Sequence, residues 1–413
     1  MSSGTTAISG SVSICFVAHR AYGALSGVDN GHAGGVERQQ AMMARWLARR
    51  GHRVSMITWD EGQADGARVH DVAVFTVCRR DAGVPGLRFF HPRWTGLCRA
   101  MARADADVYY YNLGDMGLGQ VALWCRRNSR RCVYSVASDP DCDARLPVLR
   151  PWRERILYRY GLRHADRIVV QSMRQQGMLN DGFGLRSTVI PMPCFAADFL
   201  STTAEQPRAG GTTRVLWIGR FSKEKRLEWL LDVAPRCSVL HFDVLGDANV
   251  RTPYARDLVD RAQALPNVTL HGRLPWEKVL SFYGRSMALC CTSAYEGFPN
   301  TFLEAWAHGL PVVSTFDPDG RIAEKGLGLN ATTSDEVAAG LLSLHDHVDL
   351  WQSISRSART YFLDHHTPDA VMPLFEATFK EPASCPQEAA RTSAEAVRHE
   401  STPGKKARRE AIG

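Results

Sequence analysis

Two cations stand close together in the second half of the chain. The apolar run 215–218 predicts a buried strand, and the sequence GRFSKEKR that follows it holds Arg220 and Lys225 in a short strand-to-helix connection. Because a helix N-terminus carries partial positive charge, two cations beside it predict an anion site. Two cations suit a diphosphate better than a single carboxylate. Ordinary loop charge is the alternative interpretation.

Two carboxylates form a second group, in the sequence SAYEGFPNTFLEAW. Glu296 lies in a loop after the apolar strand 288–292, and Glu304 lies early in the helix that follows. A carboxylate at that place can accept two hydrogen bonds from a vicinal diol such as a ribose, and Glu296 can do the same for sugar hydroxyls. For Glu304 alone, compensation of the helix dipole is the simpler interpretation.

The residues between these carboxylates predict a tight turn into a helix. Gly297 and Pro299 are turn residues, and Asn300 is placed to cap the helix. The backbone N–H groups of residues 298–301, Phe298 among them, are then expected to point toward the strand ends.

The first half of the chain offers fewer candidates. A glycine-rich stretch, GHAGGVERQ, follows the first predicted strand and contains Gly34 and Gly35. The strand end SVASDPDCD offers Asp139 as the carboxylate nearest to a reacting centre, with loop capping as the alternative. The DPD triplet recurs at 317–319, but turn chemistry explains both copies, and we predict no metal site.

The elements that must position these groups alternate between strand and helix. In the first half, strands are predicted at 12–18, 53–59, 108–111, 132–137, 167–170 and 188–190, with a helix at 36–50 after the first. In the second half, strands at 215–218, 240–245, 268–270, 288–292 and 311–315 alternate with helices at 225–233, 254–265, 276–285 and 300–308. Such alternation predicts an α/β protein with two parallel sheets, each covered by helices on both faces.

Composition excludes several classes of protein. The 413 residues are 45% hydrophobic and 23% charged, which is typical of soluble globular domains and not of disordered, collagen-like or coiled-coil chains. No run of about 18 apolar residues predicts a membrane-spanning helix, and the N-terminus is expected to form a strand, not a signal peptide. Eleven scattered cysteines indicate reduced thiols in a cytoplasmic protein. A net charge of +7 suits phosphorylated small molecules and is too weak to predict nucleic-acid binding.

A basic segment runs from Arg145 to Arg167, with seven arginines against two acids and several apolar side chains. It is compatible with peripheral contact between the chain and the anionic inner face of a membrane. A helix packed on its own sheet, with a solvated basic face, is the alternative.

Together these motifs resemble family-4 retaining glycosyltransferases of the GT-B fold. The segment EGFPNTFLEA with GLPVV behind it is similar to their E-x7-E motif, and GRFSKEKR is similar to their donor loop, with Arg220 and Lys225 in register. GHAGGVERQ resembles their N-terminal glycine-rich loop. The resemblance is strong over 213–330 and looser over 11–195.

The resemblance implies two Rossmann-like domains that face each other across a cleft. We expect an acceptor-binding domain over 1–194, a linker over 195–212, a donor-binding domain over 213–365, a helix over 366–380 that crosses back to the first domain, and a disordered tail over 381–413. Arg220 and Lys225 would neutralise the diphosphate of a nucleotide sugar, Glu304 would hold its ribose and Glu296 its sugar. Donor contacts would come from the backbone at Gly34, Gly35, Gly297, Phe298, Pro299 and Asn300.

The implied function is retaining transfer of a sugar from a nucleotide-diphosphate sugar to a hydroxyl of a glycan or lipid-linked acceptor, in cell-envelope or exopolysaccharide biosynthesis. No cofactor and no obligatory metal are expected. Two departures from the family pattern are Arg226, where glycine is frequent, and the absence of a histidine near Asp139. A nucleotide-sugar epimerase of the same fold and a non-catalytic scaffold are the alternatives.

Overall fold

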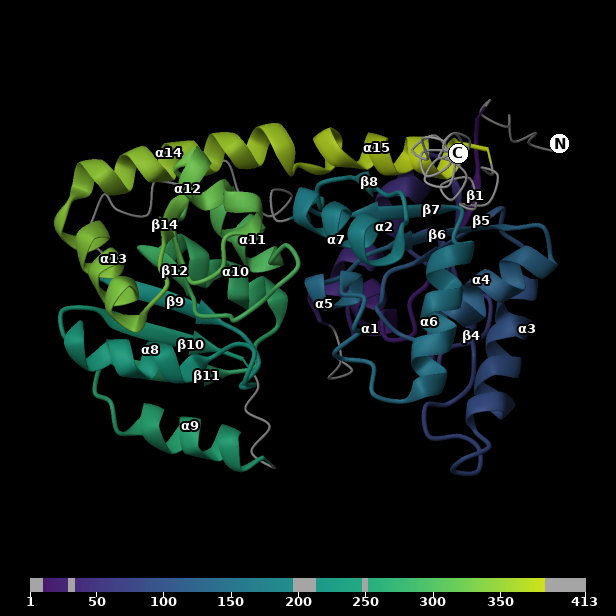
Figure 1. Ribbon diagram of the computed structural model, residues 1–413, viewed down its shortest axis with the longest axis horizontal. Helices are drawn as coiled ribbons and strands as arrows, with labels where there is room; N and C mark the ends of the chain where they lie inside the picture. Colours follow the sequence, from purple (N-terminus) through teal and green to yellow (C-terminus); the bar gives the residue numbers. More distant parts are fainter. Residues whose placement is uncertain (1–9, 29–33, 196–212, 247–251, 383–413) are drawn as a thin grey trace, which may run out of the picture.

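The computed structural model describes residues 10–28, 34–195, 213–246 and 252–382. It contains one mainly parallel and one wholly parallel sheet, each with helices on both faces, side by side in Figure 1. The predicted α/β class with two Rossmann-like domains is therefore confirmed.

The first domain is built on an eight-stranded sheet in the order β3-β4-β2-β1-β5-β6-β7-β8. Its strands are β1 (Ser13–Val17), β2 (Arg53–Thr58), β3 (Ala67–Val69), β4 (Val72–Thr76), β5 (Val108–Tyr111), β6 (Arg131–Ser135), β7 (Arg167–Val170) and β8 (Thr188–Val189). Only the edge strand β3 is antiparallel to its neighbour among the described residues. The inner strands β1, β2, β5, β6 and β7 are largely buried on both faces, which explains their apolar runs, whereas β4 is partly exposed.

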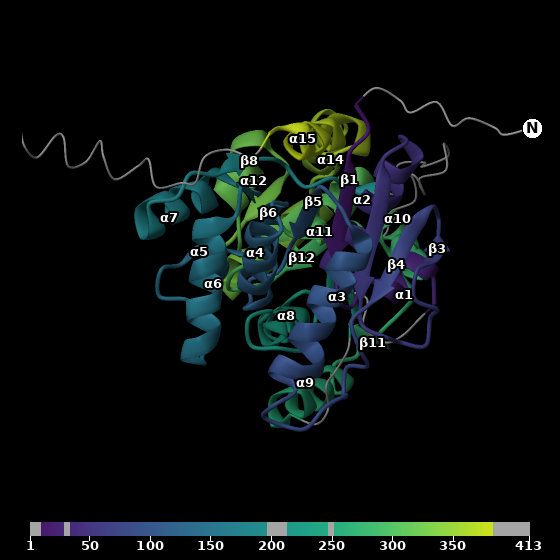
Figure 2. The ribbon, with the colours of Figure 1, turned by 90° about the vertical axis from the view of Figure 1, so that its right-hand side faces the viewer.

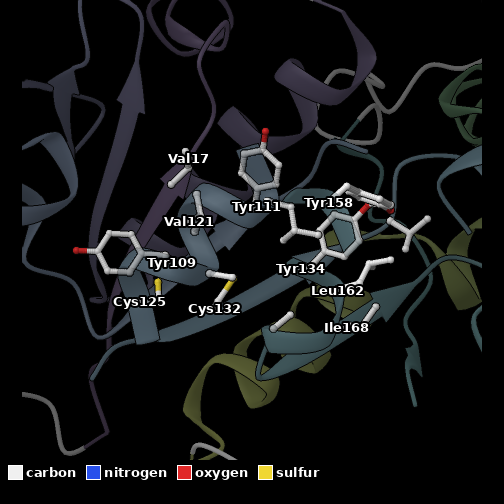
Figure 3. Close-up of a cluster of buried hydrophobic side chains, with 14 of the residues drawn as sticks. Val17, Tyr109, Tyr111, Val121, Cys125, Cys132, Tyr134, Tyr158, Leu162 and Ile168 are labelled. Atoms are coloured by element: carbon white, nitrogen blue, oxygen red, sulfur yellow. Dashed lines mark hydrogen bonds between the residues drawn. The ribbon is translucent and has the colours of Figure 1, made fainter. Parts of the chain in front are cut away.

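Two groups of helices cover the first sheet. On one face, α3 (Thr95–Ala104), α4 (Gly117–Arg127), α6 (Trp152–His164) and α7 (Met173–Phe183) surround a cluster rich in tyrosine (Figure 3). The hydroxyls of Tyr134 and Tyr158 lie 2.8 Å apart, and Tyr158 donates to the backbone oxygen of Asp141 at 2.8 Å. The other face packs against α1 (Tyr22–Ser26) and α2 (Gly35–Arg49). Buried hydroxyls thus tie the core to α5 (Asp139–Cys142), at the carboxyl end of β6.

The second domain has a six-stranded, wholly parallel sheet in the order β11-β10-β9-β12-β13-β14. Its strands are β9 (Arg214–Ile218), β10 (His241–Leu245), β11 (Val268–Gly272), β12 (Ala288–Cys291), β13 (Val312–Ser314) and β14 (Gly328–Asn330). The helices are α8 (Leu227–Val233), α9 (Pro253–Gln263), α10 (Trp276–Arg285), α11 (Asn300–Ala307), α12 (Arg321–Lys325) and α13 (Ser334–Asp346). The order reverses beside β9, and ligands of such sheets bind at the carboxyl ends near that point.

Two long helices join the domains along one side of the molecule (Figures 1 and 2). Helix α14 (Val348–His365) packs on the second domain, and α15 (Pro368–Lys380) places Phe375 and Phe379 in the core of the first, against Phe16 and Tyr110. The linker predicted at 195–212 and the tail predicted at 381–413 lie outside the described residues, apart from residues 195, 381 and 382.

Candidate active site

Contacts between the loops that follow the strands bring the two domains together. Backbone N–H groups of Met173 and Arg174, at the start of α7, donate to the Asp319 carboxylate of the second domain at 2.7 and 3.0 Å. The N–H of Phe298 donates to Gln171 Oε1 of the first domain at 2.7 Å. These bonds hold the carboxyl ends of the strands in the two sheets face to face.

Two glycines allow this close approach. A Cβ atom at Gly35 would lie 2.7 Å from Asn300 Nδ2 in the other domain, and a Cβ atom at Gly297 would lie 2.5 Å from the backbone oxygen of Ala137. Gly34 precedes α2 as its cap residue. Both Gly35 and Gly297 are therefore interdomain contacts, in addition to any contact with a ligand.

The predicted capping role of Asn300 is wrong. Helix α11 has Pro299 as its cap residue, with no side-chain cap, and Asn300 is the first helical residue. Pro299 has its φ angle at −64°, which suits a helix start, and the Asn300 amide instead meets Gly35 across the domain interface. The N–H of Phe298, expected to be available to a ligand, is bonded to Gln171.

Lys225 and Glu296 form an ion pair at the carboxyl end of the second sheet. The Lys225 ammonium contacts Glu296 Oε1, which also accepts a hydrogen bond from Ser293 Oγ at 2.6 Å. Both side chains are mostly buried, with 23% and 16% of their surface exposed. Arg220, by contrast, is 78% exposed and pairs with Glu224 at 3.2 Å. The structure thus brings the predicted lysine and glutamate together, with the arginine at the rim.

Arg226 stabilises the loop that carries Lys225. Its guanidinium donates to the backbone oxygens of Thr292 and Ser293 at 2.7 and 3.0 Å and to Thr315 Oγ1 at 2.9 Å. The φ angle of Arg226 is +47°, in the left-handed region that favours glycine. Arg226, which stands where the family often has glycine, therefore has a structural role. It adopts a backbone conformation that favours glycine, and its three hydrogen bonds offset the conformational strain.

Glu304 is buried at the bottom of a pocket between the domains. Its Oε1 accepts from Arg38 Nη2 at 3.0 Å and from Trp276 Nε1 at 3.1 Å, and its Oε2 accepts from the Tyr283 hydroxyl at 2.7 Å. Burial, with the nearby Glu304 carboxylate, raises the pKa of Tyr283 well above its usual value, so the phenol remains a donor. The Arg38 guanidinium also lies over the Trp276 ring, 5.1 Å from its centroid.

The pocket around Glu304 has a volume of about 340 Å³, open solvent at its mouth included. It is lined by Gly35, Arg38, Gln39, Met42, Pro193, Cys194, Phe195, Trp276, Asn300 and Glu304. Residues from both domains line it, so its shape depends on domain closure. Sequence reasoning did not find Arg38, Trp276 or Tyr283, because their role rests on contacts that no local spacing indicates.

Asp139 lies on the facing side of the cleft, at the start of α5. It accepts from Gln175 Nε2 at 3.1 Å and pairs with Arg174 Nε at 3.2 Å. Burial raises its pKa, and the carboxylates of Asp319 and Glu296 in the other domain add to the rise. The carboxylates of the predicted Asp139 and Glu296 therefore lie near enough to repel each other across the domain interface.

The carboxylates of the second DPD triplet are engaged with helix ends. Asp317 accepts from the N–H groups of Ile322 and Ala323 at 2.8 and 3.1 Å, and Asp319 accepts from the start of α7. Across the described residues, no group of three or more histidine, cysteine, aspartate or glutamate side chains could hold a metal ion.

Two family models match almost the whole of the two domains. Residues 34–192 match a model described as a glycosyl transferase 4-like domain, and residues 212–347 match one described as glycosyl transferases group 1. The chain belongs to the family-4 glycosyltransferases.

Relatives of this glycosyltransferase are similar over part of their length. The lipopolysaccharide 1,6-galactosyltransferase of Escherichia coli is 31% identical over 159 residues, which are 36% of this chain and 42% of that protein. A subunit of a Streptococcus pneumoniae UDP-N-acetylglucosamine–peptide N-acetylglucosaminyltransferase is 24% identical over 46% of this chain and 38% of that one. The matched region thus spans about two fifths of the curated relatives.

Solved structures share the fold of this glycosyltransferase over nearly its full length. A sucrose-phosphate synthase from Thermosynechococcus elongatus aligns with a TM-score of 0.70 at 17% identity, over 89% of this chain and 98% of that one. WaaG, a glycosyltransferase involved in lipopolysaccharide biosynthesis, aligns with a TM-score of 0.64 at 13% identity, over 89% and 100%. These similarities confirm the GT-B fold.

Proposed function

We propose that the protein transfers a sugar from a nucleotide-diphosphate sugar to a hydroxyl acceptor, with retention of anomeric configuration. The observation that carries the proposal is the interdomain pocket lined by the buried Glu304, together with the Lys225–Glu296 ion pair in the loops that follow β9 and β12. A buried carboxylate that already accepts three hydrogen bonds can exchange one or two of its donors for the hydroxyls of a ribose. Lys225 would supply positive charge for a diphosphate.

The reaction needs positive charge where the leaving group develops negative charge. As the bond between the anomeric carbon and the phosphate oxygen breaks, the sugar gains oxocarbenium character and the diphosphate leaves with the bonding electrons. Lys225, with Arg220 at the rim, would stabilise that charge, and a fixed cation of this kind is among the largest catalytic contributions an enzyme makes. The leaving phosphate oxygen then accepts the proton of the attacking hydroxyl on the same face, so the configuration is retained.

The facing carboxylates have separate proposed roles. Glu296 would accept hydrogen bonds from the hydroxyls of the donor sugar. Asp139 would face the reacting centre from the acceptor domain. Burial raises the pKa of Asp139, whereas its ion pair with Arg174 and its hydrogen bond from Gln175 lower it. We propose no cofactor besides the nucleotide sugar, and no metal step.

The acceptor is proposed to be a glycan or lipid-linked saccharide of the cell envelope or of an exopolysaccharide. The similarity to a lipopolysaccharide galactosyltransferase supports this class. The proposed location is cytoplasmic. Within the described ranges, no helix is both long and apolar enough to cross a bilayer.

A panel of nucleotide diphosphates and their sugars tests the donor. A true donor should raise the melting temperature of the protein by mass action, and its slow hydrolysis should release the nucleotide. Analysis of the released sugar then separates transfer from epimerisation, which is the second enzymatic candidate. A chain that binds no member of the panel and releases no nucleotide would instead be a scaffold.

A further inference from the structure

A surface of the first domain, outside the lining of the pocket, exposes an unusual concentration of large apolar side chains. We define the cationic apolar face by Val84, Leu87, Phe90, Val148, Trp152 and Ile156, whose exposed fractions run from 57% to 75%. They come from two segments, the loop after β4 and residues 148–156, which lead into α6 and form its start. Exposed apolar groups gathered in this way mark a site of interaction with another body.

A direct contact shows that the two segments form one surface. The Arg153 guanidinium, at the start of α6, lies over the Phe89 ring at 5.1 Å from its centroid. Phe89 and its neighbour Phe90 pack edge to face, with centroids 4.8 Å apart, and Phe90 stacks on Trp94. The aromatic side chains of the loop and the exposed side chains at the start of α6 therefore form one continuous surface.

The charges on this face have one predominant sign. The loop at 79–94 holds four arginines against one aspartate, and residues 143–160 hold five arginines against two acids. Arg145 pairs with Asp143, while Arg150 and Arg153 are exposed beside Trp152. Exposed aromatic and aliphatic groups among arginines suit the boundary between anionic headgroups and acyl chains.

Helix α6 divides into two parts with different surroundings. Its second half is packed, since the approach of Gly161 to α4 leaves no room for a Cβ atom beside Leu118. Its first half exposes Trp152 and Ile156. The alternative interpretation of the basic segment, a helix packed on its own domain, thus holds for residues 158–164. The first turns of α6 expose apolar side chains that a partner could contact.

We propose that the cationic apolar face docks the protein on an anionic phospholipid surface. Both segments follow strands of the first sheet at their carboxyl ends, which is the side of the domain that faces the cleft. Docking would bring the acceptor half of the cleft close to the headgroups. That consequence rests on the proposed function, but the docking itself does not.

Vesicle flotation of the full chain tests the proposal. We expect binding to vesicles of phosphatidylcholine with phosphatidylglycerol, little binding to phosphatidylcholine alone, and weakening by salt. The double variant Arg150→Gln/Arg153→Gln should bind on the order of 25-fold more weakly, at about fivefold for each arginine. Phe90→Ser/Trp152→Ser should lose about tenfold or more through the apolar contact.

A matched control separates this face from general stickiness. Val348→Ser/Arg356→Gln changes one exposed apolar and one exposed basic residue on α14, far from α6 in Figure 1, and should bind as the wild type does. Quenching by brominated phospholipid should fall in Trp152→Phe. Absence of binding to anionic vesicles would overturn the proposal and favour a protein partner.

The proposal would also be overturned if the variants of the cationic apolar face bound vesicles as tightly as the wild type. It would equally be overturned if the α14 control variant lost as much binding as they do. Nucleotide release in the absence of vesicles should be the same in the face variants and the wild type. This readout keeps a failure of docking distinct from a failure of the proposed reaction.

Discussion

Gly297→Ala should separate the two domains and slow catalysis while each domain stays folded. The added Cβ atom would lie 2.5 Å from the backbone oxygen of Ala137, 2.9 Å from Gln171 Oε1 and 3.1 Å from Ser138 Cα, all in the other domain. The backbone of Gly297 is not in the left-handed region, so the alanine meets no conformational strain of its own. The whole cost falls on the interdomain contact.

The size of the effect follows from that distance. Ordinary van der Waals contact begins at 3.4 Å, so the backbone oxygen and the new carbon must move apart by about 0.9 Å. Because neither atom belongs to a flexible side chain, the domains themselves must move. A misplacement of about 1 Å between catalytic groups can cost about 100-fold in rate, and we expect a loss of that order in kcat.

The assay compares nucleotide release, donor affinity and thermal unfolding in the wild type and its glycine variants. Gly284→Ala is the matched control, because Gly284 is exposed on α10 and a Cβ atom added there would have nothing within 4 Å. It should keep full activity and gain slight stability. Gly297→Val should be slower than Gly297→Ala. A Gly297→Ala enzyme within a fewfold of the wild-type rate would refute the closed interface.

Three further substitutions address single groups. Lys225→Ala should lower turnover about 100-fold in steady-state kinetics, as does loss of an oxyanion donor, and near-normal turnover would make this lysine a structural cation. Glu304→Ala should weaken nucleotide binding about tenfold by calorimetry, since bonds to a charged group vanish, and unchanged affinity would remove its proposed role. Burial lowers the pKa of His366 from 6.5 to about 4, so the unfolded chain binds more protons between those values and the free energy of unfolding should fall as pH drops through them. His366→Asn should flatten this slope in denaturant titrations at several pH values.

The sequence predicted the strands and the motif positions because both are local signals. Strands β5 and β7 and helix α10 have the predicted bounds, since an apolar run or a 3.6-residue period depends only on neighbouring residues. The short hairpin of β3 and β4 was missed, as was β14. Strands β3 and β14 are three-residue edge strands, too short for an apolar run to mark them. Strand β4, next to the edge, does carry the apolar run VAVF, so its omission was an error of the prediction and not a lack of signal.

The parts of the site that depend on domain placement were beyond sequence reasoning. Arg38 and Glu304 are 266 positions apart, and their bond exists only because α2 and α11 meet across the cleft. Asn300 has a residue type typical of caps, yet Pro299 occupies the cap position and Asn300 contacts the other domain. The residue type indicates which hydrogen bonds a side chain can make. Here the contact between the two domains determines which of these bonds forms.

The side chains proposed to bind the donor are already bonded to one another within the protein, and this affects how a donor can bind. Lys225 is bonded to Glu296, and Glu304 is bonded to Arg38. A diphosphate that takes Lys225 would leave the mostly buried Glu296 carboxylate without its cation, which is unfavourable unless new donors reach it. Hydroxyls of a sugar attached to that diphosphate are such donors. A nucleotide sugar, as the proposed donor, would therefore replace the partners of both charges, whereas a nucleotide alone would replace one, so the pairing would favour the complete donor over the spent product. The cost of ordering these side chains is already met in the ion pairs, and binding becomes an exchange between arranged partners.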